Sequence, residues 1–432
     1  METAWDVEIV ADSDTRWKWG ATIAARLAGD RPVRTHATLL LGRSVPNEQQ
    51  LDDVGIEPDT LRRAGVAATV ARLADSDAQV VVLACIGGGV QSLLHALARA
   101  WSGRRERPVV VTGYVGLVYE KIVDGLLARA GADVVLANSA QDAERFRATY
   151  SGVGVDPGRV VQTALPFLGG LPHDPQAAGR ERPFTVTFVT QPGVPETKAE
   201  RRYALLQAVE HANRHPDRHV LVKLRGRVGE RTTHVEPYNY ASLRAARQLP
   251  ANLQLVHGAM GPVLDRTDLC LTVSSTAAIE AMHRHIPTGI LTDFGIRESL
   301  GNQLFLGSGA FTSWRAVHAG ALPATDPHWA ARNGVHDPDP YAALRHRVAE
   351  LVEQRTALAP LRPWLDPEDA AAYLPGLLAR YGLDPHGVPL APGRAGGAEA
   401  PLRTRAVRAA ARRVYGVGVR VVEPRIKRLA QI

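Results

Sequence analysis

The feature that most constrains this chain is a repeated alternation of short apolar runs with longer stretches of helical composition. In the first 165 residues the apolar runs lie at 7–11, 37–41, 80–84, 109–112, 133–137 and 160–164. Their apolar residues are continuous rather than alternating, which is typical of strands buried on both faces. Stretches such as 60–74 between them look helical. Strands that alternate with helices build a parallel sheet with helices on both sides, so we expect an α/β domain over residues 1–165.

The alternation stops once and then restarts. Residues 166–183 contain four prolines and three glycines without periodicity, which predicts an interdomain linker. Apolar runs then recur from 184–189 to 288–292 and predict a second α/β domain over 184–383, with two closing helices near its end. Residues 384–432 form a flexible linker and basic tail in this interpretation. The expected architecture is two tandem doubly wound domains that face a cleft.

Composition excludes several classes of protein. Of the 432 residues, 45% are hydrophobic and 22% charged, which is ordinary for a soluble globular protein and excludes a mainly disordered one. We find no apolar run of the length that crosses a membrane, and the acidic N-terminus does not resemble a secretory signal. Cys85 and Cys270 lie in apolar runs, which predicts reduced core residues in a cytoplasmic protein.

Open α/β sheets bind ligands beyond the carboxyl ends of their strands, so candidate residues follow the strands. Asp12, Asp14, Arg16 and Trp17 come directly after the first strand. Either carboxylate could act as general base on a sugar hydroxyl, and the sequence does not choose between them. Arg16 could hold an anionic acceptor and Trp17 could stack on a sugar ring. The alternative is an ordinary helix cap.

Glycines follow the third strand of the first domain. Gly88 and Gly89 would let an acceptor approach the backbone at a helix N-terminus, and Tyr114 follows the next strand at the same edge. A tight strand–helix turn would explain the same glycines. The segment matches neither a dinucleotide-binding GxGxxG motif nor a P-loop.

Cations follow the strands of the second domain. Lys223 and Arg225 stand at the end of one strand, and this pair of side chains suits a phosphate, although a solvated loop has a similar composition. Gln191 closes the preceding strand and joins the predicted donor site.

Three hydroxyl residues separate a later strand from its helix. Ser274, Ser275 and Thr276, together with the helix N-terminus, could cradle a phosphate without a metal, or could simply cap the helix. Glu280, one turn further on, could reach ribose hydroxyls. The sequence contains no HExxH, CxxC or dense carboxylate set, so we expect neither a metal nor a bound cofactor.

The chain resembles GT-B glycosyltransferases. The resemblance is carried by a strand, the run Ser274-Ser275-Thr276-Ala-Ala-Ile-Glu280-Ala-Met that follows it, and Pro287. The chain is most similar to the glycosyltransferases that build bacterial capsule and teichoic-acid polymers and to bacterial sialyltransferases. The resemblance implies two Rossmann-like domains of GT-B type and a Ser-Thr pair on the donor phosphates. A His-Pro pair that is frequent in those families is replaced here by Lys223-Leu224-Arg225.

The resemblance implies metal-independent transfer of a sugar from a nucleotide-activated donor to a cell-envelope polysaccharide or lipid-linked acceptor. UDP-N-acetylglucosamine 2-epimerase shares the architecture and a similar Ser-rich segment, so a sugar-nucleotide epimerase is the alternative enzyme. The third interpretation is a non-catalytic protein whose basic tail contacts nucleic acid.

The positive charge of the chain is concentrated in the tail. Residues 391–432 hold ten arginines or lysines and two acids, which leaves a net charge of −1 for the remainder. The tail contains no recognisable nucleic-acid-binding module. We therefore expect residues 401–432 to dock a cytoplasmic enzyme on the anionic inner face of the plasma membrane by charge, the alternative being a solubilising tail.

Overall fold

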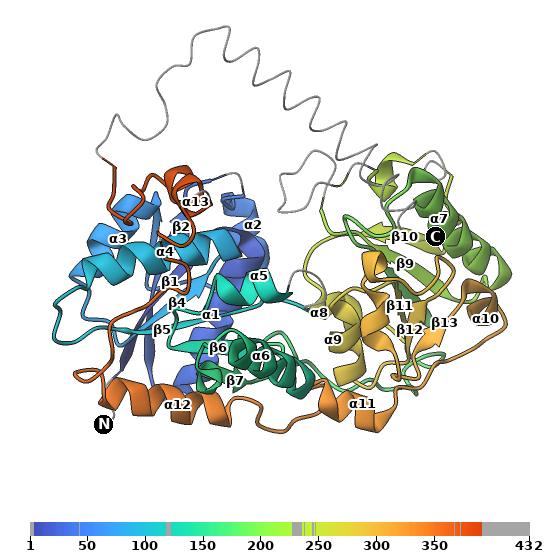
Figure 1. Ribbon diagram of the computed structural model, residues 1–432. Helices are drawn as coiled ribbons and strands as arrows, with labels where there is room; N and C mark the ends of the chain where they lie inside the picture. Colours follow the sequence, from blue (N-terminus) through green and yellow to red (C-terminus); the bar gives the residue numbers. More distant parts are fainter. Residues whose placement is uncertain are drawn as a thin grey trace, which may run out of the picture.

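The computed structural model describes residues 4–42, 44–117, 122–226, 236, 238–243, 246, 248–366, 368–371 and 373–390. Within them the chain forms two parallel β-sheets that lie beside one another, each covered by helices (Figure 1). The predicted α/β architecture with two Rossmann-like units is confirmed. The predicted basic tail lies outside the described residues. None of the described helices is long and apolar enough to cross a membrane.

The first sheet has seven parallel strands in the order β3-β2-β1-β4-β5-β6-β7. Their bounds are β1 (Trp5–Ala11), β2 (Val33–Leu40), β3 (Thr60–Ala64), β4 (Val80–Ala84), β5 (Val109–Gly113), β6 (Val134–Ala137) and β7 (Val160–Gln162). The strand order reverses between β1 and β4, and ligands of doubly wound sheets bind at such switch points. The β1–α1 turn therefore occupies the predicted ligand-binding edge.

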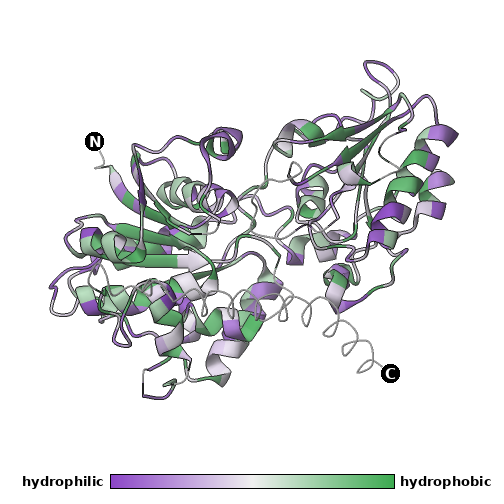
Figure 2. Ribbon diagram, turned by 90° about the horizontal axis from the view of Figure 1, so that it is seen from above, coloured by the Kyte–Doolittle hydropathy of each residue, from purple (hydrophilic) through white to green (hydrophobic). Residues whose placement is uncertain are grey.

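Helices cover both faces of the first sheet. They are α1 (Asp14–Ala28), α2 (Glu48–Val54), α3 (Val66–Ala74), α4 (Gly87–Ala100), α5 (Ile122–Leu127) and α6 (Ala140–Gly152), followed by the short 3₁₀ helix η1 (Pro157–Arg159). Neighbouring residues of one strand enter different cores, since Val10 packs with α3 and α4 whereas Ile9 packs with α1. Figure 2 accordingly shows hydrophobic strands between helices with hydrophilic outer faces.

The prediction of a helix over 60–74 is wrong for its first part. Thr60–Ala64 forms β3, an edge strand paired in parallel with β2, and a helix begins only at Val66. The sequence Thr-Leu-Arg-Arg-Ala has the composition of a helix, but pairing with an exposed strand edge outweighs that local preference.

The second sheet has six parallel strands in the order β10-β9-β8-β11-β12-β13. Their bounds are β8 (Thr185–Val189), β9 (His219–Lys223), β10 (Leu253–Val256), β11 (Leu269–Thr272), β12 (Thr288–Leu291) and β13 (Phe311–Thr312). The helices are α7 (Lys198–Arg214), α8 (Gly261–Leu264), α9 (Ala277–His283), α10 (Trp314–His318) and α11 (Pro327–Arg332), with 3₁₀ turns η2 (Tyr240–Ser242), η4 (Glu298–Leu300) and η5 (Asn302–Phe305). Both cysteines are buried and unbridged, as their apolar surroundings predicted.

The two closing helices do not pack on the second sheet. The prediction that the second domain extends to residue 383 is therefore wrong. Helix α12 (Ala342–Glu353) packs Leu344 and Val348 into the core on the α1 side of the first sheet. Helix α13 (Leu374–Arg380) places Leu374 and Leu378 in the core on the α4 side. The chain thus crosses back after α11, and Figure 1 shows α12 and α13 at opposite edges of the first domain.

A chain of hydrogen-bonded histidines joins α7 to α10. Arg218 Nη1 lies 3.5 Å from His211 Nε2, His211 Nδ1 lies 3.3 Å from His318 Nδ1, and His318 Nε2 lies 3.1 Å from Gln207 Oε1. Since the arginine can only donate and the amide oxygen can only accept, each histidine donates once and accepts once. The network is therefore satisfied only when both histidines are neutral.

We expect this network to make the protein less stable in acid, and a His211→Gln variant to lose part of that effect. Burial, reinforced by the charges of His215 and Arg218, lowers the pKa of His211 to about 3. A histidine in the unfolded chain has a pKa of about 6.5. The unfolded chain binds the proton first. Stability is therefore complete above about pH 6.5 and falls towards pH 3 by up to about 1.4 kcal/mol per pH unit.

Chemical denaturation between about pH 7 and about pH 4 measures this difference in slope. His346→Gln is the matched control, because that side chain is exposed on α12, and it should keep the wild-type slope. Identical slopes for the wild type and His211→Gln would contradict the prediction.

Candidate active site

The β1–α1 turn presents two carboxylates that differ in their partners. Asp12 accepts hydrogen bonds at both oxygens, from Arg16 Nη1 at 2.9 Å and from the Ile86 amide at 2.9 Å. Asp14 is the first residue of α1, whose N-cap is Ser13, and its Oδ2 lies 3.7 Å from Arg225 Nη2 of the second domain. Asp12 thus holds the turn together, and Asp14 is directed towards Arg225 of the second domain.

Arg225 joins the predicted acceptor and donor sides. It follows β9 by two residues, donates to Thr15 Oγ1 and lies next to Asp14. Its own side chain is 46% exposed, so a ligand can reach it. Residues from the carboxyl edges of both sheets therefore meet at one place, although 210 positions separate Thr15 from Arg225 in the sequence.

A buried cation lies behind this contact. Lys223 is the last residue of β9, is only 5% exposed and donates from Nζ to the Leu224 carbonyl at 2.8 Å. Burial and the charge of Arg225 lower the pKa of Lys223 to about 8, against the opposing charge of Glu280. The ammonium is still the main form at neutral pH and can respond to an added negative charge.

Glu280 lies in α9 and is partly buried as a residue. Burial raises the pKa of Glu280 to about 7, and the positive charges of Lys18, Arg284 and Lys223 oppose that rise. At neutral pH this group can therefore both donate and accept hydrogen bonds. Sequence reasoning missed Lys18, which stands four residues after Asp14 on α1 with its Nζ 5.1 Å from the centre of the Phe167 ring; the helical spacing could have identified it.

The three predicted cradle hydroxyls have different roles. Ser274 is 3% exposed, donates to the Leu300 carbonyl and is fixed by Gln191, which accepts from the Ser274 amide at 2.9 Å and donates to its hydroxyl at 3.1 Å. The assignment of Ser274 and Gln191 to the donor is corrected, because both side chains brace the β11–α9 turn. Ser275 and Thr276 stay half-buried at the turn.

Thr276 faces the first domain. Its Oγ1 lies 3.2 Å from the position that a Cβ on Gly116 would occupy, and its side chain makes no capping hydrogen bond to the described part of α9. The Ser275 hydroxyl accepts weakly from the Ala277 amide at 3.3 Å. These two hydroxyls are the part of the predicted cradle that is not engaged in bracing the turn.

Two predicted acceptor contacts on the β1–α1 turn are wrong. Trp17 is 1% exposed and lies in the core with Trp19, because the side chain at this position of α1 faces the sheet rather than the cleft. Arg16 forms an ion pair with Asp12 at 2.9 Å, so its charge holds a carboxylate of the protein instead of an acceptor.

The glycines after β4 accommodate α13 and not a ligand, which corrects their predicted role. A Cβ on Gly88 would lie 3.1 Å from Leu377 Cδ1, and a Cβ on Gly89 would lie 3.5 Å from the Tyr381 hydroxyl. Both partners come from the segment that crosses back near residue 380. The sequence around the glycines contains no indication of that neighbour.

Tyr114 is also a packing residue rather than an acceptor contact. Its ring lies 4.2 Å from the Arg129 guanidinium and 5.4 Å from the Phe146 ring. Its hydroxyl donates to the Ile122 carbonyl at 3.3 Å. Burial raises the pKa of this hydroxyl.

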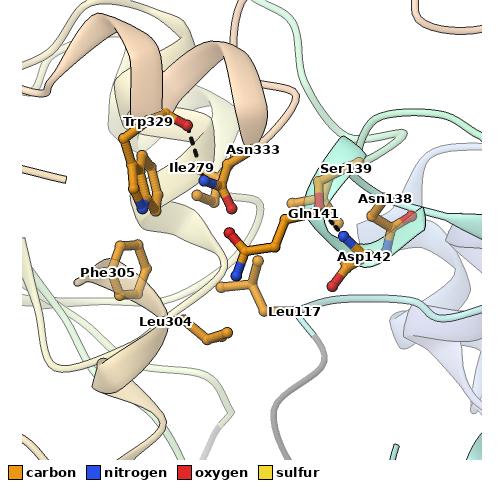
Figure 3. A pocket seen from close by; sticks show the side chains of 11 residues that line it. Leu117, Asn138, Ser139, Gln141, Asp142, Ile279, Leu304, Phe305, Trp329 and Asn333 are labelled. Atoms are coloured by element: carbon orange, nitrogen blue, oxygen red, sulfur yellow. Dashed lines mark hydrogen bonds between the residues drawn. The ribbon is translucent and has the colours of Figure 1, made fainter. Parts of the chain in front are cut away.

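A small pocket lies elsewhere between the two domains (Figure 3). Asn138, Ser139 and Asp142 line it from the end of β6 and the start of α6, and Ile279 and Trp329 line it from the second half of the chain. Burial raises the pKa of Asp142 to about 6. The pocket volume of about 20 Å³ suffices for about one water molecule, so we place the candidate site at Asp14 and Arg225. Among the described residues, no three or more His, Cys, Asp or Glu side chains are grouped to hold a metal ion.

A family model described as "Putative glycosyltransferase (DUF6716)" matches residues 7–351, which is most of the chain. The chain belongs to this glycosyltransferase family. The match includes both sheets and every residue of the candidate site. The resemblance to glycosyltransferases is thereby confirmed at the level of the family.

Solved structures with TM-scores above 0.5 share the fold of this glycosyltransferase family member at low identity. The UDP-GlcNAc 2-epimerase from Methanocaldococcus jannaschii has a TM-score of 0.52 and 11% identity, with 81% of this chain and 99% of that chain covered. The UDP-N-acetylglucosamine 2-epimerase from Rickettsia bellii has a TM-score of 0.51 and 11% identity, with 82% and 98% covered. Arabidopsis thaliana UGT89C1, complexed with UDP-L-rhamnose, has a TM-score of 0.47 and 12% identity, with 82% and 94% covered. No curated protein matches the sequence.

Proposed function

We propose that this family member transfers a sugar from a nucleotide-activated donor on the second domain to a hydroxyl group of an acceptor on the first. The observation that carries the proposal is the meeting of Asp14 with Arg225, 3.7 Å apart, between the carboxyl edges of the two sheets. Glycosyl transfer needs a base near the attacking hydroxyl and positive charge near the leaving phosphate. This arrangement supplies the two groups from opposite sides of the cleft.

Each residue has a role in the proposed reaction. The acceptor oxygen bonds to the anomeric carbon of the donor sugar while the bond from that carbon to the phosphate oxygen breaks. Asp14 takes the proton of the acceptor hydroxyl, and Lys223 and Arg225 stabilise the negative charge that develops on the leaving phosphate. Ser275 and Thr276 donate hydrogen bonds to the phosphates, and Glu280 holds the ribose hydroxyls. The mechanism invokes no metal, since the two cations take the part that a metal plays in other transferases.

The donor phosphate and Asp14 compete for Arg225. Arg225 donates to Thr15 and lies next to Asp14 in the structure. A phosphate can accept two charge-assisted hydrogen bonds from a guanidinium, whereas Asp14 meets Arg225 only as an ion pair at 3.7 Å. Donor binding would therefore release the Asp14 carboxylate for the acceptor, and donor should bind first.

Incubation with UDP-sugars tests the proposal, since the structures of similar fold are named for UDP-sugar enzymes. We expect free UDP and a glycosylated product when a hydroxyl acceptor is added, with activity retained in EDTA. The fold neighbours with the higher TM-scores are epimerases, so epimerisation is the second candidate. An isomer of the donor sugar formed without acceptor would favour the epimerase, and loss of activity that added metal restores would contradict the metal-free mechanism. A protein that binds no nucleotide-sugar at all would favour a non-catalytic role.

We further propose that the acceptor belongs to the cell envelope and that the cytoplasmic enzyme meets it at the membrane. Residues 391–432 carry a net charge of +8, and each basic residue near an anionic surface contributes about 1 kcal/mol at low salt. We expect truncation after Leu390 to abolish sedimentation with anionic vesicles at low salt while donor hydrolysis is unchanged. Neutral phosphatidylcholine vesicles are the control. Equal sedimentation of truncated and full-length protein would exclude the tail as the anchor.

A further inference from the structure

The carboxyl edges of the two sheets differ in polarity. On the second sheet, the first two residues after β8, β9, β11 and β12 include Gln191, Arg225, Ser274 and Asp293. The apolar residues among them, Leu224 and Val273, are buried. The edge of the second sheet is thus polar. Gln191 and Ser274 bond to each other there, and the exposed Arg225 suits a charged ligand such as a nucleotide.

The first sheet instead exposes large apolar side chains at its carboxyl edge. Leu41 follows β2 directly and is 61% exposed, and Ile86 follows β4 by two residues and is 50% exposed. Single exposed apolar residues are ordinary on a protein surface. These two, however, follow the strands on either side of β1, and the helix after β1 begins with Asp14, the proposed base.

The strand register defines where Leu41 and Ile86 lie relative to β1. Ala11 of β1 is paired with Leu39 on one side and with Ala84 on the other. Leu41 and Ile86 each lie two residues beyond those partners, so they flank the β1–α1 turn at a separation of about 10 Å, which is two strand spacings. The Ile86 amide donates to Asp12 at 2.9 Å, which fixes Ile86 beside that turn.

A third exposed apolar residue continues the same edge. The Tyr114 hydroxyl donates to the Ile122 carbonyl at 3.3 Å, and this bond holds the start of α5 near the end of β5. Val123, the next residue, is 50% exposed. We name Leu41, Ile86 and Val123 the apolar rim; its members lie beyond the ends of β2, β4 and β5, and β1, which ends at Ala11, lies between β2 and β4.

We infer that the acceptor is amphipathic, with its reactive hydroxyl at Asp14 and an apolar chain or ring over Leu41 and Ile86. This inference rests on the proposed function, because the position of the hydroxyl is taken from it. Apolar contact is favourable in proportion to the area removed from water, whereas a purely polysaccharide acceptor would cover these side chains with hydroxyl groups. An alkyl chain of a lipid-linked sugar and an apolar aglycone share the required chemistry.

Saturation-transfer NMR with octyl β-glucoside below its micellar concentration, in the presence of UDP, tests the inference. Methyl β-glucoside is the probe without an apolar chain. In the wild type, saturation should reach the octyl protons, and Leu41→Ser with Ile86→Ser should reduce that transfer by about fivefold or more. Absence of saturation transfer to the octyl protons in the wild type, or equal saturation transfer in the Leu41→Ser, Ile86→Ser variant, would overturn the inference.

A matched control separates the apolar rim from general hydrophobicity. Leu171 and Leu322 are 82% and 53% exposed at other places, so Leu171→Ser with Leu322→Ser should leave the octyl signal unchanged. Because all four side chains are exposed, both double variants should unfold at the wild-type temperature. If the rim is continuous, Val123→Ser should independently reduce the octyl signal. A reduction of the octyl signal in the control variant equal to that in the rim variant would overturn the assignment.

Product analysis keeps this inference distinct from the proposed function. Octyl binding at the rim without any glycosylated product would refute glycosyl transfer and support the apolar site. Transfer to methyl and octyl glucoside at equal rates would support the transferase and overturn the amphipathic acceptor. A last comparison sets dodecyl glucoside in phosphatidylcholine vesicles against octyl glucoside free in solution. The vesicle-bound glucoside should be the better substrate if the acceptor is membrane-borne, and the free glucoside should be better if the acceptor is a free apolar molecule.

Discussion

An Asp14→Asn variant is expected to turn over about 10²- to 10⁴-fold more slowly than the wild type, because an amide cannot take the proton of the acceptor hydroxyl. Its affinity for the donor should be equal or higher. Asp14 lies 3.7 Å from Arg225, so removal of its charge leaves the guanidinium available to the phosphate. Steady-state kinetics measure the first effect and titration calorimetry with the nucleotide-sugar measures the second.

Asp12→Asn is the matched control for this change. Both oxygens of Asp12 accept hydrogen bonds from Arg16 and the Ile86 amide, so the variant should lose thermal stability more than turnover at saturating donor. A folded but inactive Asp12→Asn, together with an Asp14→Asn of unaltered rate, would transfer the role of base to Asp12.

Replacement of Lys223 by methionine should lower turnover by about 10²- to 10³-fold, because the leaving phosphate loses a preorganised positive charge in a site with little water. Methionine fills a similar buried volume, so the fold should persist. The pKa of Lys223 is about 8. The cation is therefore present below about pH 8 and is lost as the pH rises through that value, so turnover of the wild type should decline there.

Two further variants test this assignment. Lys223→Arg keeps the charge at all accessible pH values and should shift the alkaline decline upward, which a merely structural role would not do. Lys198→Met, at the exposed start of α7, removes a lysine outside the cleft and should behave as the wild type. An unchanged rate and pH profile in Lys223→Met would show that the phosphate charge is met elsewhere.

The strands were predictable wherever burial on both faces makes a run apolar throughout. The edge strand β3 escaped prediction because it is buried on neither face, so its sequence contains two exposed arginines. The strand ends, in turn, placed Asp12, Asp14 and Arg225 at the cleft, since the rule that ligands bind at carboxyl edges needs only strand positions.

Side-chain direction was not predictable to the same degree. The sequence Arg16-Trp17-Lys18-Trp19 places charged and aromatic residues alternately, and only the packing of α1 shows that both tryptophans enter the core. Gly88 and Gly89 are explained by contacts with Leu377 and Tyr381, which are almost three hundred positions away. No local pattern reports a neighbour at that separation.

The return of α12 and α13 to the first sheet has a consequence for the order in which the protein can fold during synthesis. Residues 1–165 leave the ribosome first, yet Leu344, Val348, Leu374 and Leu378 complete the two cores of their sheet. At synthesis rates of about 5–20 residues per second, the first domain waits on the order of ten seconds or more for its missing core residues. During that interval its α4 and α1 faces remain exposed, and a chaperone that binds apolar surface would find its substrate there before the second domain is finished.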